Sequence, residues 1–129
     1  MSILEQSTFI KEIHPFENLT KLQLEKFAEA LDIIYLKKDE ILQKEGEEPE
    51  NLYFIIKGLV QEKQDEEVLS IYSKNEFFDP ISLIENYSKH TFVTAQETIC
   101  YSLPRELFVK TLHENPHLEV SFSNQFLKN

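Results

Sequence analysis

Glycine is scarce in this sequence, with only Gly46 and Gly58 among 129 residues. Because glycine adopts positive φ angles at no steric cost, a chain this poor in it is expected to keep it where a tight turn requires it. We therefore predict turns at both positions and a β-strand between them. The sequence has no glycine-rich loop that could cradle a phosphate and no recognisable nucleophile motif, which argues against catalysis by this chain.

Cysteine and long apolar runs are also scarce. The single cysteine, Cys100, cannot form an internal disulfide, which fits a reducing compartment. No apolar run approaches the roughly 20 residues that a membrane-spanning helix needs, and the N-terminus has no basic segment followed by a hydrophobic one. We expect a cytoplasmic protein with no membrane partner.

Basic residues are few relative to acidic ones. The chain has 13 Lys and Arg against 23 Asp and Glu, giving a formal net charge of −10. This is the wrong sign for a surface that neutralises phosphate backbones, so we expect no nucleic-acid partner. The acidic residues concentrate in segments 45–50 and 65–67. Their spacing lacks the alternation of a calcium loop, and we interpret them as solvated loop tips.

The length and the apolar content fit one compact domain over residues 1–129, with helices at about 2–31. Ser2 with Glu5 and Thr20 with Gln23 have the spacing of helix-capping boxes. After the second pair, apolar residues recur at helical intervals, which predicts two N-terminal helices.

From residue 33 to about residue 103 the pattern changes to short β-rich runs. Such spacing predicts a mainly β fold with flanking helices, built as an antiparallel roll or sandwich. The predicted strands are 33–36, 40–42, 52–57, 59–63, 67–72, 91–95 and 98–103.

The segment from about 104 to 128 returns to a helical pattern. Pro104 suits the first position of a helix, and Asn115 with Pro116 predicts the start of another. The last helix carries an apolar stripe of Leu118, Phe122 and Phe126. This stripe is compatible with packing onto the roll and equally with a homodimer.

This order of elements resembles the cyclic-nucleotide-binding domain family from about Pro15 to Phe126. The family's fold is a double-stranded β-helix, a jelly-roll-like β-roll flanked by helices. The positions that resemble the family's motifs are Leu42, Gly46, Leu52 to Ile55, Gly58, Val60, Glu76 to Phe78, Ala95, Leu103 and Pro104.

Segment 76–95 is most similar to a subgroup of this family. Its members lie at the N-termini of bacterial signal-transduction proteins that also carry paired CBS domains and a nucleotidyltransferase domain. The resemblance implies a regulatory or sensor module that acts on downstream domains of the same polypeptide, where any catalysis would reside. An alternative is a receptor from a transcription regulator without its DNA-binding helices.

Ligand-binding members of the family hold the cyclic phosphate with backbone amides of a short helix and with an arginine. A glutamate that follows a glycine accepts the ribose hydroxyl. Aligned back from Ala95, the arginine position falls on Lys89, followed by His90 and Thr91, and the Gly-Glu pair falls on Asp79 and Pro80. The phosphate cassette is thus degenerate at three functional positions.

Each change has a physical consequence. Lys89 keeps a positive charge but cannot make the two-pronged contact of a guanidinium. Pro80 offers the ribose no carboxylate and has no backbone N–H, so a charge-assisted hydrogen bond of roughly 1.5 to 3 kcal/mol has no counterpart.

Asp79 also has the position of an N-cap, with Pro80 as the first residue of a helix through Ile84. Its carboxylate would then bond the amides that otherwise receive the phosphate. A phosphate about 4 Å from it would be repelled by roughly 4 kcal/mol at an effective dielectric near 20.

Three interpretations of this region remain open. It is a surface turn with no small ligand, a site for a different anion or nucleotide read by Ser82, Lys89, His90 and Thr91, or a true cAMP or cGMP site. We expect no cofactor and no metal. The candidate ligand-binding residues are Phe78, Asp79, Pro80, Ile81, Ser82, Lys89, His90 and Thr91.

Overall fold

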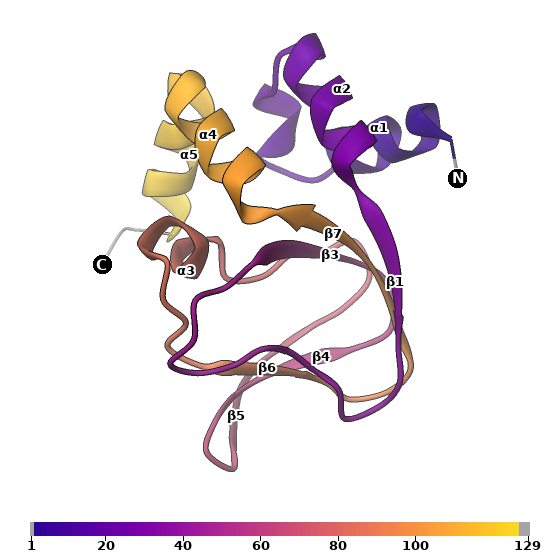
Figure 1. The fold of residues 1–129 in the computed structure, drawn as a ribbon, viewed down its shortest axis with the longest axis vertical. Coiled ribbons are helices and arrows are strands. Elements are labelled where there is room, and N and C mark those ends of the chain that lie inside the picture. Colours follow the sequence, from indigo (N-terminus) through magenta and orange to yellow (C-terminus); the bar gives the residue numbers. More distant parts are fainter. Residues whose placement is uncertain (1, 127–129) are drawn as a thin grey trace.

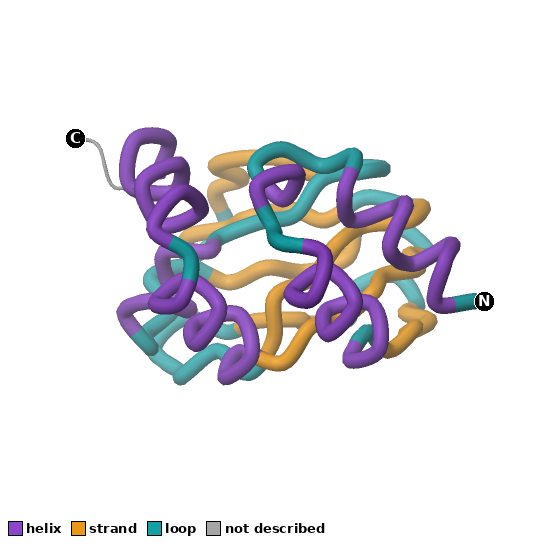
Figure 2. The backbone as a smooth tube through the Cα atoms, turned by 90° about the horizontal axis from the view of Figure 1, so that it is seen from above, coloured by secondary structure: helices purple, strands orange, loops and turns teal. Residues whose placement is uncertain are grey.

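The computed structural model describes the backbone of residues 2–126 and the side chains of residues 2–122. Two antiparallel sheets face each other as a β-roll, and the N- and C-terminal helices lie together over one of them (Figures 1 and 2). This arrangement confirms the predicted mainly β fold with flanking helices.

The N-terminal part consists of helix α1 (Ile3–Lys11), a short 3-10 helix η1 (Phe16–Asn18) and helix α2 (Lys21–Ala30). The Ser2 side chain accepts a hydrogen bond from the Glu5 backbone N–H at the start of α1. Thr20 and Gln23 form a complete capping box at the start of α2. Both predicted helix starts are therefore confirmed.

The first sheet has the strand order β1-β7-β3, and the second has the order β2-β6-β4-β5. Every predicted strand is present, with its ends shifted by at most one residue. The bounds are β1 Asp32–Leu36, β2 Ile41–Gln43, β3 Asn51–Lys57, β4 Val60–Gln64, β5 Glu67–Tyr72, β6 Thr91–Thr94 and β7 Thr98–Pro104.

Both glycines lie in turns, as predicted, and both have positive φ, +86° at Gly46 and +116° at Gly58. The Gly58 position has a second requirement. A Cβ atom there would lie 2.4 Å from the Thr98 hydroxyl oxygen and 2.7 Å from the Glu97 carbonyl oxygen. Only glycine therefore lets β3 turn into β4 beside the start of β7.

Helix α3 (Pro80–Glu85) lies between β5 and β6, and α4 (Arg105–Glu114) and α5 (Pro116–Phe126) follow β7. The expected helix start at Pro104 is wrong by one residue, because Pro104 still pairs with Asn51 across β7 and β3 and has the non-helical backbone angles φ −58° and ψ 136°. Asn115 caps α5 as predicted, accepting a hydrogen bond from the Leu118 backbone N–H.

The core has two parts, separated by the first sheet. Alternate residues of β3 and β7, including Leu52, Phe54 and Leu103, pack against the helices, where Leu118 and Phe122 of α5 are also buried. The side chain of Phe126 lies outside the described residues. A smaller cluster fills the roll between the two sheets and consists of Ile55, Val60, Phe78, Phe92 and Cys100.

Candidate functional site

The candidate site is centred on the start of α3, where the chain turns sharply. Asp79 has left-handed backbone angles, φ 53° and ψ 52°, and is the N-cap residue, with Pro80 at the first helical position. Aspartate is one of the few residues other than glycine that tolerate this conformation. Proline suits the position after it because its φ is fixed and an N–H would have no helical partner there.

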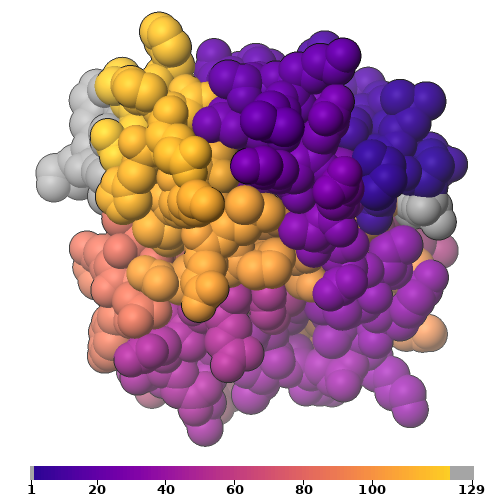
Figure 3. Space-filling model, turned by 45° about the horizontal axis from the view of Figure 1, so that its top comes forward, coloured from indigo at the N-terminus to yellow at the C-terminus, as the bar shows by residue number. Residues whose placement is uncertain are grey.

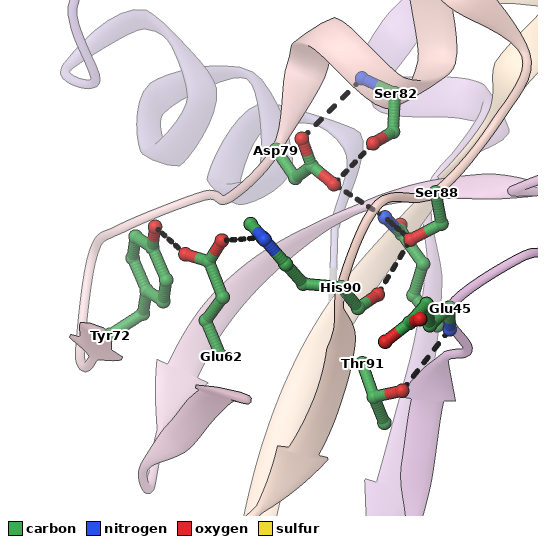
Figure 4. Close-up of polar contacts among 9 residues, drawn as sticks. Glu45, Glu62, Tyr72, Asp79, Ser82, Ser88, His90 and Thr91 are labelled. Atoms are coloured by element: carbon green, nitrogen blue, oxygen red, sulfur yellow. Dashed lines mark hydrogen bonds and ion pairs between the residues drawn. The ribbon is translucent and has the colours of Figure 1, made fainter. Parts of the chain in front are cut away.

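The Asp79 carboxylate bonds to its own helix. It accepts hydrogen bonds from the Ser82 backbone N–H at 3.4 Å and from the Ser82 hydroxyl at 2.5 Å (Figure 4). The predicted N-cap is therefore present, and the carboxylate lies where the helix presents a backbone N–H. Ser82 is buried, so its polar atoms depend on this partner.

A buried side chain from β2 fixes the carboxylate from the other side. The Gln43 amide donates to Asp79 Oδ2 at 2.7 Å and to the Ser88 hydroxyl at 2.9 Å. Ser88 in turn donates to the backbone carbonyl of His90 at 2.7 Å. This chain of bonds joins β2, the start of α3 and the segment that leads into β6 (Figure 4).

A second polar group lies on the neighbouring strands. His90 Nδ1 is 2.6 Å from Glu62 Oε2, and the Tyr72 hydroxyl donates to Glu62 Oε1 at 2.9 Å. The His90 side chain is 28% exposed and that of Glu62 is 16% exposed. His90 lies just before β6, and Glu62 of β4, whose register partner is Phe92 of β6, is close enough to pair with its ring.

Burial controls the electrostatics of the site. Loss of solvent raises the pKa of Asp79 above its ordinary value, the Ser82 and Gln43 hydrogen bonds oppose this shift, and the nearby Glu62 charge adds to it. Burial, with the Glu62 bond, also raises the pKa of Tyr72, so this group is a neutral phenol that donates to a carboxylate. Inside the roll, burial raises the pKa of Cys100 of β7 to about 12, which leaves it an unreactive thiol.

The other candidate residues divide between the interior and the surface. Phe78 is buried and stacks on Phe92 with ring centroids 4.6 Å apart, and the Tyr53 ring also stacks on it with centroids 5.9 Å apart. Ile81 is half-buried in α3. Thr91 accepts a hydrogen bond from the Glu45 backbone N–H, so it fastens the acidic loop to β6.

Lys89 is not part of the polar network, which consists of Gln43, Glu62, Tyr72, Asp79, Ser82, Ser88 and His90. Its side chain is exposed and forms no hydrogen bond or ion pair with any residue that the structure describes. Of the four residues proposed to read a different ligand, Ser82 and His90 belong to the network, Thr91 bonds a neighbouring loop, and Lys89 stands apart.

Sequence reasoning missed four members of the network, Gln43, Glu62, Tyr72 and Ser88. Gln43 and Glu62 come from strands far away in the chain, and only the cross-strand register brings them to the site. Ser88 lies within the cassette segment and is fully buried. A polar residue next to an apolar strand gives no signal of burial on its own.

The described residues contain no group of three or more His, Cys, Asp or Glu side chains placed to hold a metal ion. None of the helices, over the described part of the chain, is long and apolar enough to cross a membrane. The chemistry available at the site is hydrogen bonding by carboxylate, imidazole, amide and hydroxyl groups beside stacked aromatic rings.

Comparison with known proteins gives a consistent result. The family model described as "Cyclic nucleotide-binding domain" matches residues 33–115. The chain is 36% identical over 93 residues to a cAMP-dependent protein kinase regulatory subunit of Debaryomyces hansenii, covering 70% of this chain and 20% of that protein. It is 29% identical over 127 residues to a cGMP-dependent protein kinase of Eimeria tenella, covering 96% of this chain and 12% of that protein.

Among solved structures, the sensor domain of the transcriptional regulator DNR from Pseudomonas aeruginosa is similar with a TM-score of 0.85 at 17% identity, over 97% of this chain and 88% of that one. The regulatory domain of Toxoplasma gondii PKA with cAMP is similar with a TM-score of 0.80 at 15% identity, over 96% and 50%. These likenesses concern the fold. The chain spans a fifth or less of the length of the two curated relatives named above.

Proposed function

Because the chain belongs to the cyclic nucleotide-binding domain family, we propose that it is a regulatory module whose phosphate cassette is capped by its own Asp79. The module would act in a larger signalling protein without binding cAMP or cGMP in the usual way. The bond between the Asp79 carboxylate and the Ser82 backbone N–H is the observation that carries this proposal.

Three further features support it. Pro80 presents neither a carboxylate nor an N–H at the position after Asp79. Gln43 holds the Asp79 carboxylate in place, so an entering phosphate would have to break a partly buried hydrogen bond as well as overcome like-charge repulsion. Phe78, Phe92 and Tyr72 pack closely inside the roll beside the polar network.

The finer assignment rests on the resemblance of segment 76–95. We propose that the module precedes paired CBS domains and a nucleotidyltransferase domain in a bacterial signal-transduction protein, and that any catalysis lies in those domains. The sequence of the gene that encodes this chain tests this directly, because CBS repeats downstream support the assignment and a basic helix-turn-helix contradicts it.

The alternative is a genuine receptor for a cyclic nucleotide or another small anion, taken from a transcription regulator. Two observations favour it. The DNR sensor domain shares the fold over nearly its whole length, and Lys89 keeps a positive charge at the family's arginine position. A ligand would then have to displace Asp79 from Ser82.

A thermal melt with cyclic nucleotides separates the two functions. We expect no rise in Tm with cAMP or cGMP at concentrations of about 1 mM, because Asp79 caps the phosphate cassette. Binding with a Kd 100-fold below the ligand concentration would instead stabilise the fold by about 2.7 kcal/mol. AMP and GMP at the same concentration control for weak anion binding. A saturable rise specific to the cyclic compounds would support the receptor instead.

Restoring the family's residues tests the cap itself. The variant Asp79→Gly/Pro80→Glu/Lys89→Arg removes the carboxylate from Ser82, supplies a ribose acceptor and provides a guanidinium. Glycine fits the left-handed angles at position 79 without strain. We expect measurable cyclic-nucleotide affinity by calorimetry, whereas the matched variant Pro80→Glu/Lys89→Arg, which keeps Asp79, should gain much less. Equal affinities of the two variants would contradict the cap.

A further inference from the structure

The sequence contains a single arginine, Arg105, and the structure places it at the junction of three segments. Arg105 is the first residue of α4. Its backbone N–H donates to the Glu50 carbonyl at 2.9 Å, in the loop before β3. Its side-chain Nε–H donates to the Leu83 carbonyl at 2.7 Å, in the last turn of α3.

The Leu83 carbonyl needs such a donor, because α3 ends soon after it. The last carbonyls of a helix have no partner within the helix. Here the backbone N–H groups of Asn86 and Tyr87 both donate to the Ser82 carbonyl. The Leu83 carbonyl therefore receives its hydrogen bond from α4, by way of Arg105.

Electrostatics also favours a position of the Arg105 guanidinium at the end of α3 rather than at the start of its own helix, α4. A cation is unfavourable at the N-terminus of a helix and favourable at the C-terminus, where the carbonyls give a partial negative charge. Arg105 begins α4 and lies against the end of α3, so electrostatics holds the guanidinium on the neighbouring helix. A bond with a charged donor is also stronger than one between neutral groups.

The six-residue helix α3 is thus fastened at both ends by other parts of the fold. Gln43 of β2 holds its N-cap Asp79, and Arg105 of α4 holds its last turn. A helix this short has little stability of its own, so its position follows these attachments. In the space-filling view the start of α4 lies directly beside the α3 segment (Figure 3).

We propose that Arg105 is the positioning residue that passes a displacement of the cassette helix α3 to the C-terminal helix α4. This inference rests on the proposed regulatory function and names the connection through which the module would signal. Any movement of α3 must either move Arg105, and with it the first turn of α4, or break the bond to Leu83.

A double-mutant cycle on the full chain tests this, with hydrogen exchange of α4 amides as the measurement. Asp79→Gly loosens the start of α3, and Arg105→Met keeps the length of the side chain but removes the donor. We expect Asp79→Gly to speed exchange in α4 by roughly threefold or more when Arg105 is present, and to have little effect in the Arg105→Met background.

The control is Lys110→Met, which removes an exposed cation from the same helix and should leave the effect of Asp79→Gly intact. If Arg105 served only to stabilise α4, Arg105→Met would speed exchange but the effect of Asp79→Gly would remain the same factor in both backgrounds. That result, or no effect of Asp79→Gly on α4 at all, overturns the proposal.

Should Arg105→Met fail to fold, Arg105→Lys serves in the same cycle, because lysine keeps the charge without the planar donor group. The transmitted effect should then fall, and an undiminished effect contradicts the proposal. The cycle uses no ligand. If the proposed function is wrong, cAMP or cGMP will stabilise the protein in the thermal melt. If only the role of Arg105 is wrong, the contradiction will appear in the hydrogen exchange of α4 amides.

Discussion

At the residue scale, Asp79 carries the functional argument, and its partly buried carboxylate predicts that stability depends on pH. Burial raises its pKa in the folded state, so the folded protein binds the proton more tightly than the unfolded chain does. The free energy of unfolding that protonated Asp79 contributes is then fully present below the pKa of the unfolded chain, about 3.9. It is lost as the pH rises through the higher pKa of the folded protein.

The variant Asp79→Asn isolates this contribution, because asparagine is neutral, caps helices and tolerates left-handed angles. We expect the unfolding free energy of the native protein, relative to Asp79→Asn, to fall as the pH rises from about 4 towards neutrality. Urea denaturation of both proteins over a pH series measures it, and the other titrating groups cancel in the difference. A difference that stays constant or grows with pH would show that the folded pKa is not raised.

At the element scale, Gly58 determines how β3 turns into β4. Gly58→Ala places a Cβ at φ +116° and within 2.7 Å of β7 atoms, so both backbone strain and a steric clash oppose it. We expect a loss of roughly 2 to 4 kcal/mol in unfolding free energy by urea denaturation. Gly46→Ala is the matched control, because it has a positive φ with no atom within 4 Å and should lose only about 1 kcal/mol. Equal losses would mean that the contact with Thr98 does not matter.

The elements were also the part of the fold that the sequence predicted best. The short β-rich runs and the capping pair Thr20 and Gln23 are local signals, and the structure confirms the elements they predict. The sequence predicts a helix start at Pro104 because nothing in the neighbouring residues shows that β7 extends to Pro104 and pairs there with Asn51 of β3. The Gln43 and Glu62 contacts were missed for the same reason, since the register between distant strands depends on the whole sheet.

At the scale of the whole molecule, Phe16 connects the helices to the roll. It is fully buried in η1, and its ring has edge-on contacts with Phe54 of β3 at 5.3 Å and Phe122 of α5 at 5.6 Å between centroids. Phe16→Ala should therefore cost about 3 to 5 kcal/mol and raise hydrogen exchange in both the N-terminal and C-terminal helices. Leu22→Ala on α2, where the side chain is 61% exposed, should change stability by less than about 0.5 kcal/mol. If Phe16→Ala raised hydrogen exchange only in η1, Phe16 would not connect the N-terminal helices to the C-terminal helices.

The contact between His90 and Glu62 bears on the charge that a ligand would meet beside the cassette. Glu62 already provides a half-buried carboxylate beside the cassette, and Tyr72 and His90 hold it in place. A substitution at position 90 would remove one of the two partners of that carboxylate and leave the Tyr72 hydroxyl as the other. Next to a cassette whose family is named for negatively charged ligands, the fold thus carries a second acidic group, and an anion that entered the roll would have to approach this carboxylate as well as that of Asp79.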